Sequence, residues 1–262
     1  MLKRRLIPKL QMRRSIRGIR PRMVLVTTIR FDDVVEVGDP VSQAKIYQAQ
    51  AADELIFLDL DAWRDDRSTL LDVVQTAAEE IFMPFTVGGG VRRLEDFRLL
   101  LANGADKVSV NTGAVEDPDL IATAADAFGA QCVVLSIDYR REDDGTYRVW
   151  TRGGTVATDL DPVGWAVEGA RRGAGEILVT SIDRDGTRRG LDLEITRRVA
   201  EEVGIPVITS GGCGAASHFV AGFLEGRADA VASGTYFCFR DENPMQTRSQ
   251  IKNAGIPIRL HT

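Results

Sequence analysis

Short runs of apolar residues alternate along the chain with longer amphipathic stretches. Eight of these runs are almost continuously apolar, which is typical of parallel strands that are covered on both faces. The runs are Leu6–Leu10, Leu55–Leu60, Phe85–Val87, Lys107–Val110, Val133–Ile137, Ile177–Ser181, Val207–Thr209 and Ala230–Ala232. Stretches with helical spacing separate them, for example Leu94–Asn103 and Ala215–Glu225. The pattern predicts a closed (β/α)8 barrel, and an open doubly wound α/β sheet is the alternative.

An internal repeat favours the closed barrel. Residues 84–91, Pro-Phe-Thr-Val-Gly-Gly-Gly-Val, correspond to residues 206–213, Pro-Val-Ile-Thr-Ser-Gly-Gly-Cys, with an offset of 122 residues. The same offset relates residues 54–61 to 176–183, and an offset of 123 relates Thr112 to Thr235. Two halves of four βα units each would close a barrel, whereas a doubly wound sheet requires no such repeat. We therefore expect one barrel domain over residues 1–262.

Composition excludes several classes of protein. The chain has 262 residues, the usual size of one such barrel, and its net charge of −5 disfavours nucleic-acid binding. It contains neither an apolar stretch long enough to span a membrane nor a signal peptide, so no membrane association is expected. Three widely spaced cysteines predict neither a disulfide framework nor a zinc site, and they favour a reducing, cytoplasmic location.

The charge is unevenly distributed near the start of the chain. Residues 3–22 contain nine Lys or Arg and no Asp or Glu. Such a segment is either a solvated basic arm or a basic loop beside an anionic substrate, and the sequence favours neither.

Glycines and hydroxyl residues follow two matching pairs of strands. Gly88-Gly89-Gly90 and Gly211-Gly212 each follow a predicted strand, and Asn111-Thr112 and Gly234-Thr235 end the strand after it. Glycine lets backbone N–H groups approach an anion closely, and a helix N-terminus with a hydroxyl completes a cradle. A single pair would be compatible with ordinary turns. Because the pattern occurs twice in register, it predicts two phosphate sites for a ligand with a phosphate at each end.

Carboxylates at the C-terminal ends of the strands are candidate acids and bases. Active sites of these barrels lie at that end. Asp138 directly follows an apolar run and is the best catalytic candidate, whereas Asp59 and Asp185 are better explained as loop caps. The two histidines, His218 in a predicted mid-helix position and the penultimate His261, favour neither imidazole catalysis nor a histidine metal site, so we expect no metal and no cofactor.

Charged residues also stand at the opposite ends of the strands. Arg5, Glu54, Lys107 and Glu176 each lie just before or at the first residue of a strand, where side chains can point into the bottom of the barrel. They form either a salt-bridge cluster that closes the barrel floor or a functional ring of alternating charge. The residues alone leave both interpretations open.

Several stretches together carry a resemblance to a known family. They are Arg5-Leu-Ile-Pro8, Gly38-Asp-Pro40, residues 53–59, residues 84–90, residues 104–112, Arg172-Gly-Ala-Gly-Glu176 and residues 181–187, Ser-Ile-Asp-Arg-Asp-Gly-Thr. The chain resembles the cyclase subunit of imidazole glycerol phosphate synthase over nearly its whole length. That family is a (β/α)8 barrel paired with a glutaminase subunit. Ammonia from the glutaminase crosses the barrel and attacks a bis-phosphorylated ribulosyl intermediate, which gives imidazole glycerol phosphate.

The resemblance assigns roles to residues of this chain. It implies one phosphate site at Gly90, Asn111 and Thr112, and a second at Asp185, Gly186, Gly212, Gly234 and Thr235. It makes Asp138 one of two catalytic aspartates and Asp106 a contact for the glutaminase. It also favours an ammonia gate, rather than a structural cluster, for Arg5, Glu54, Lys107 and Glu176.

The chain departs from the family at the end of its first strand. The family pattern Ile-Pro-Cys-Leu-Asp reads Ile7-Pro-Lys-Leu-Gln11 here, so Gln11 stands where the other catalytic aspartate belongs. An amide can form hydrogen bonds but cannot transfer a proton at neutral pH. A longer, strongly basic loop is expected to follow, over Arg13–Arg22. Residues 239–251 resemble a branch associated with acetamidino modification of surface sugars, in which barrel and glutaminase supply ammonia to a separate sugar amidotransferase.

Three hypotheses follow from these residues. The first is the ammonia-receiving synthase subunit of a glutamine amidotransferase, specialised for sugar modification. The second is the authentic lyase of histidine biosynthesis. The third is a scaffold that binds a phosphorylated ligand without turnover. An isomerase of the same barrel type fits less well, because it too requires a carboxylate at the end of the first strand.

Overall fold

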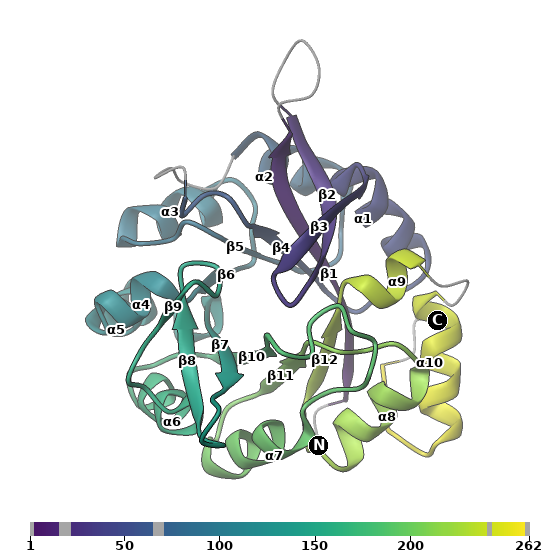
Figure 1. The fold of residues 1–262 in the computed structure, drawn as a ribbon. Coiled ribbons are helices and arrows are strands. Elements are labelled where there is room, and N and C mark those ends of the chain that lie inside the picture. The colour runs from purple at the N-terminus through teal and green to yellow at the C-terminus, as the bar shows by residue number, and fades with distance from the viewer. Residues whose placement is uncertain (1–2, 16–21, 65–70, 240–242, 260–262) are drawn as a thin grey trace.

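A computed structural model describes residues 3–15, 22–64, 71–239 and 243–259, and it contains a closed parallel barrel (Figure 1). Each barrel strand pairs in parallel with the next, and the last pairs with the first. Around the barrel the strands are β1 (Arg5–Ser15), β4 (Leu55–Asp59), β5 (Phe85–Gly88), β6 (Lys107–Val110), β7 (Val133–Arg141), β10 (Glu176–Ser181), β11 (Val207–Ser210) and β12 (Ala230–Ser233). The predicted (β/α)8 barrel is confirmed, and the open sheet is excluded.

The two halves of the barrel repeat in register. Val87 of β5 pairs with Val108 of β6, and the corresponding Thr209 of β11 pairs with Val231 of β12. After each pair comes a five-residue helix that begins on a threonine, α4 (Thr112–Glu116) and α9 (Thr235–Phe239). The sequence repeat therefore corresponds to a repeat of structure.

Two antiparallel ribbons extend the first strand of each half beyond the barrel. β1 pairs with β2 (Arg22–Ile29), which pairs with β3 (Asp32–Gly38). β7 pairs with β8 (Tyr147–Thr151), which pairs with β9 (Val156–Ala157). Both ribbons lie at the barrel mouth (Figure 1).

The first ribbon corrects the prediction of a basic loop after Leu10. Arg13, Arg14 and Ser15 belong to β1, and Arg22 begins β2, because residues 11–15 form an antiparallel ladder with residues 22–26. The run Met23–Val26 is buried, and this apolar run is the feature of the sequence that indicates β2. Residues 16–21 of the predicted loop lie outside the described residues.

Helices surround the barrel in the order that the alternating pattern predicts (Figure 1). Their bounds are α1 (Pro40–Ala49), α2 (Leu71–Glu80), α3 (Leu94–Ala102), α5 (Asp119–Phe128), α6 (Pro162–Arg171), α7 (Leu193–Glu202), α8 (Ala216–Leu224) and α10 (Pro244–Asn253), with a 3-10 turn at Ala130–Cys132. Several start as sequence rules expect: Asp39 caps α1, Asp161 caps α6, and a proline follows each cap. No helix among the described residues is both long and apolar enough to cross a membrane.

The barrel interior is filled by an apolar layer that is separate from the larger core between strands and helices. Its buried members are Ile7, Ile56, Val134, Leu178, Ile208, Ala230 and Ala232, with Leu58 packed against them. Interior packing of this kind makes the barrel a closed core rather than an open pore. It also divides the interior into a lower end, at the start of the strands, and an upper end, where they finish.

Candidate active site

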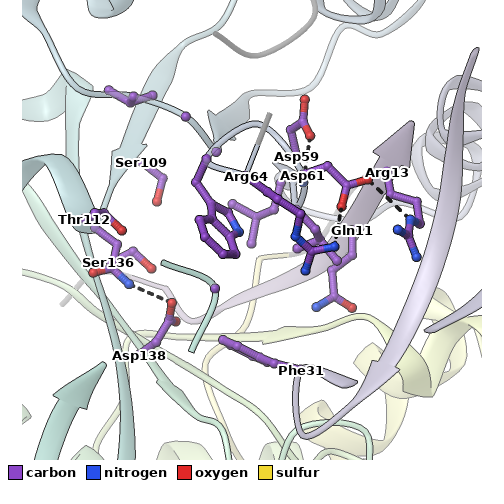
Figure 2. Close-up of a pocket in the computed structure, with 18 of the residues that line it drawn as sticks. Gln11, Arg13, Phe31, Asp59, Asp61, Arg64, Ser109, Thr112, Ser136 and Asp138 are labelled. Atoms are coloured by element: carbon purple, nitrogen blue, oxygen red, sulfur yellow. Dashed lines mark hydrogen bonds and ion pairs between the residues drawn. The ribbon is translucent and has the colours of Figure 1, made fainter. Parts of the chain in front are cut away.

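A pocket opens at the upper end of the barrel, where the sequence places the candidate chemistry. Its lining includes Gln11 of β1 and Asp138 of β7, which lie opposite each other in the strand order (Figure 2). The two positions correspond in the repeat. Gln11 pairs with Leu58, Asp138 pairs with Thr180, and Leu58 and Thr180 are 122 residues apart. Each half of the barrel therefore presents one polar side chain at the same height, an amide from one side and a carboxyl from the other.

Asp138 is half-buried and accepts a hydrogen bond of 2.7 Å from the Asn111 side-chain amide. Burial raises the pKa of Asp138 from its ordinary 3.8 to about 6, although the Lys9 ammonium and the Asn111 amide partly oppose that rise. The residue lies within β7 rather than at its end, because β7 continues to Arg141 beside β8. A carboxyl with a raised pKa in a pocket is suited to take up or release a proton near neutral pH.

Gln11 belongs to a buried polar network that joins the barrel to the first ribbon. Its side-chain amide lies 3.3 Å from the Thr28 hydroxyl, and that hydroxyl donates to Asp185 Oδ2 at 2.7 Å. Lys9 Nζ lies 3.8 Å from the other oxygen of Asp185, and the Lys9 residue is only 4% exposed. The sequence alone does not indicate a role for Thr28, because this residue lies in β2 and only the fold brings it close to Gln11.

The first predicted phosphate site lies in the same pocket. Gly90, Asn111 and Thr112 all line it, and Gly90 has a left-handed φ of 73°. The Asn111 side-chain oxygen is buried and has no hydrogen-bond partner in the part of the chain that the structure describes. The Thr112 hydroxyl accepts from the backbone N–H of Arg152, at the turn of the second ribbon.

The second predicted phosphate site is not brought into this pocket. Asp185, Gly212, Gly234 and Thr235 are absent from its lining, and Gly186 lines a neighbouring groove. The loop between β10 and α7 packs over Gly212, where a Cβ would lie 2.2 Å from the Gly190 carbonyl oxygen. Close packing of backbone segments thus explains the glycine at 212, and its anion-binding role stays a prediction.

Further side chains complete the pocket. Arg13 and Arg64 lie 3.3 Å and 4.0 Å from the carboxylate of Asp61, and all three line the cavity (Figure 2). Trp63 and Phe31 line it from two different loops. The basic run near the start of the sequence was a signal for Arg13, but nothing in the sequence indicated Arg64 or the aromatic residues.

Asp59 behaves as the loop cap that its position predicts. Its Oδ1 accepts from the backbone N–H groups of Asp61 and Ala62 at 3.2 Å. His218 lies in the first turn of α8 rather than in mid-helix, and its Nδ1 accepts from the Gly214 N–H at 3.0 Å. Within the described ranges no group of three His, Cys, Asp or Glu side chains is arranged to hold a metal ion, and His261 lies outside them.

The four charged residues at the lower end form a closed ring. Arg5 Nη1 lies 2.9 Å from Glu54 and 2.7 Å from Glu176, and Lys107 Nζ lies 3.1 Å and 3.0 Å from the same two carboxylates. Burial by itself raises the pKa of Glu54, but Arg5 and Lys107 together hold it below its ordinary value. The ring is thus a set of charged, mutually neutralised groups at the barrel floor.

Asp106 has a structural role in the barrel floor. Its carboxylate accepts from the Phe85 N–H at 2.9 Å, just as Asp229 accepts from Val207 at the corresponding place in the second half. Both carboxylates satisfy the first N–H of a neighbouring strand. Asp106 is nevertheless exposed, so the predicted contact with a partner is compatible with this position.

Comparison with known proteins identifies the class and then the family. The chain matches the family described as "Histidine biosynthesis protein" over residues 16–242, and with its (β/α)8 barrel and polar upper pocket it belongs to that class. It is 54% identical over 262 residues, with 99% of both chains covered, to a protein of Prochlorococcus marinus (strain MIT 9313) named "Putative imidazole glycerol phosphate synthase subunit hisF2". The chain therefore belongs to the imidazole glycerol phosphate synthase cyclase-subunit family, and the resemblance drawn from the sequence is confirmed.

Proposed function

We propose that this protein is a specialised cyclase-family subunit that receives ammonia from a glutaminase partner. It binds a bis-phosphorylated ligand at the barrel mouth, and its ammonia serves a reaction other than the cyclisation of histidine biosynthesis. The observation that carries the proposal is the pairing of Asp138 with an amide, Gln11, at the corresponding position across the pocket.

The chemistry of cyclisation explains why this pairing matters. Opening a ribulosyl phosphate and closing an imidazole requires proton transfers on opposite faces of the intermediate, so two titratable groups are needed. Asp138 has a raised pKa and can supply one. Gln11 is committed to Thr28 and has no proton to transfer at neutral pH. The cation on the same strand, Lys9, lies 3.8 Å from a carboxylate oxygen of Asp185.

The lower half of the barrel supports the ammonia-receiving role. The neutralised ring of Arg5, Glu54, Lys107 and Glu176 stands at the floor, and the apolar layer lies between it and the upper pocket. Neutral ammonia crosses an apolar layer at far lower cost than ammonium, because burying an uncompensated charge is expensive. A glutaminase docked at the floor, near Asp106, would deliver ammonia at this ring.

The tail over residues 239–251 supports acetamidino modification of sugars as the destination of the ammonia, with a separate sugar amidotransferase as a further partner. Two alternative functions each have a supporting observation. Retention of Asp138 and the first cradle favours authentic cyclisation. Loss of the first-strand carboxylate favours a non-catalytic scaffold.

One assay separates these functions. The ribulosyl intermediate and ammonium are supplied to the purified protein, and the absorbance of the intermediate is followed. Specialisation predicts little or no turnover, whereas roughly 1 s⁻¹ or more would establish an ordinary histidine-pathway cyclase. In parallel, the glutaminase partner is mixed with the protein and glutamine hydrolysis is measured. Absence of both a complex and stimulation by any bis-phosphate would exclude the ammonia-receiving role.

A further inference from the structure

A second hollow lies at the rim of the barrel, outside the pocket between Gln11 and Asp138. It is lined by the turn between β2 and β3, by Arg140 near the end of β7, and by residues 186–189 of the β10–α7 loop. The Arg30 N–H donates to the Asp185 carbonyl at 2.9 Å, and a Cβ on Gly186 would lie 2.0 Å from the Thr28 carbonyl oxygen. Turn and loop are therefore packed together, so the hollow is a built feature of the fold.

Positive charge is concentrated in this hollow. Its lining contains Arg30, Arg140, Arg188 and Arg189, against two carboxylates, Asp32 and Asp33. None of the four guanidinium groups has an ion-pair partner among the residues that the structure describes, although Arg5, Arg13 and Arg172 elsewhere do. Four arginines against two carboxylates give the lining an excess of positive charge, which favours binding of an anion. We call these four residues the arginine groove.

Two of the arginines are held in place by aromatic rings. The guanidinium of Arg140 lies 4.7 Å from the Trp150 ring centroid, and that of Arg188 lies 5.1 Å from the Phe239 ring centroid. Stacking of this kind orients the guanidinium without neutralising it. The Arg140 Nε is in addition buried with no hydrogen-bond partner within the described part of the chain.

The backbone around the groove is locally strained. Arg30, Asp33 and Arg188 have left-handed φ values of 56°, 46° and 61°, a conformation that side chains other than glycine seldom adopt. At Arg30 the cause is local, because Arg30 and Phe31 (φ 64°) form the two-residue turn between the paired Ile29 and Asp32, and such hairpin turns take a left-handed φ at both positions.

We propose that the arginine groove binds the diphosphate group of a small molecule outside the upper pocket; of the residues assigned to the second phosphate site, Gly186 alone is in the lining of the groove. Planar guanidinium groups form paired hydrogen bonds with phosphate oxygens, and several arginines around one hollow suit a group with adjacent phosphates. The two flanking carboxylates and the overall charge of −5 disfavour a nucleic-acid backbone as the occupant. The ligand would bridge the β2–β3 turn, β7 and the β10–α7 loop.

Calorimetric titration at low salt tests the proposal, with inorganic diphosphate and a nucleoside diphosphate as probes of the free and the esterified group. The test variant is Arg30→Gln with Arg189→Gln, because both residues are exposed and their loss leaves the core intact. The matched control is Arg197→Gln with Arg198→Gln, which removes the same charge from the exposed face of α7. We expect affinity to fall roughly ten-fold or more in the test variant and little in the control.

Two further variants decide where the probe binds. Arg140→Gln should weaken binding as well, because it removes a third guanidinium from the groove. Thr235→Val removes a hydroxyl of the predicted second phosphate site but leaves the four arginines unchanged. Loss of diphosphate affinity in Thr235→Val with full affinity in the double arginine variant would overturn the proposal. Equal losses in the test and control double variants would overturn it too, since they would show a general charge effect.

Discussion

The two halves of this barrel share one backbone plan but differ in chemistry at equivalent positions. Gly89 packs against the carbonyl of Asp59, and Gly211 packs in the same way against the carbonyl of Ser181. At the mouth, however, the first half presents the amide of Gln11 and the second half presents the carboxyl of Asp138. The two halves share the glycines that allow close backbone packing, because that packing tolerates little change. A polar side chain at the mouth, in contrast, can differ between the halves without disturbing the fold.

The largest effect is expected from single substitutions of the two mouth residues, Gln11 and Asp138. Asp138→Asn should abolish residual cyclisation with free ammonium, and Gln11→Asp should raise it, by about 10²–10⁴, the usual contribution of general acid–base catalysis. Turnover of the ribulosyl intermediate, followed by absorbance, measures both. Gln11→Asn serves as the control, because it keeps an amide. A rate in Gln11→Asp no higher than in Gln11→Asn would show that the amide does not limit the chemistry.

The second largest effect is expected on stability, and it tests whether the backbone packs equally closely in the two halves. An alanine Cβ at Gly89 or Gly211 would lie 2.2 Å or 2.5 Å from a carbonyl oxygen, and both glycines have a left-handed φ. We expect Gly89→Ala and Gly211→Ala to lower the free energy of unfolding by similar amounts, about 2–4 kcal/mol. Urea denaturation measures both. Gly204→Ala is the control, since nothing lies within 4 Å of its added Cβ. A large loss in one half only would contradict structural equivalence.

A smaller effect should show whether both halves bind phosphate. Thr112 and Thr235 begin the matching five-residue helices, but only Thr112 lines the pocket. If both predicted phosphate sites bind one ligand, Thr112→Val and Thr235→Val should each lower the affinity for a bis-phosphorylated sugar by roughly ten-fold. A loss of that size is expected when a hydrogen bond to a charged group is removed. Titration calorimetry measures the affinities. A loss confined to Thr112→Val would restrict phosphate binding to the first half.

The smallest effect concerns the pH dependence that Asp138 alone contributes. The pKa of Asp138 is about 6 in the folded protein and exceeds the ordinary 3.8. The protonated carboxyl therefore contributes fully to the free energy of unfolding below about pH 4, and that contribution is lost as pH rises through 6. Asp138→Asn should therefore stabilise the fold by on the order of 1 kcal/mol at pH 7 and not at pH 4. Thermal unfolding at both pH values measures the difference. A gain that is equal at both would show that burial does not raise this pKa.

The order of apolar runs and the repeat were sufficient to predict the barrel and its two halves. Continuous apolar runs are typical of parallel strands that are buried on both faces, and an offset of 122 residues indicated which strands correspond. The same local rules placed Asp138 and Thr112 at the mouth, because the apolar run of each strand stops close to these residues, although β7 itself continues to Arg141.

Contacts between distant segments could not be read in this way. Thr28 reaches Gln11 because β1 and β2 continue into a ribbon beyond the barrel, where the basic sequence predicts a loop. The arginine groove joins a turn, a strand end and a loop that lie far apart in the chain. Periodicity reports only which face of an element is buried, whereas the partner of each face is decided when the whole barrel closes.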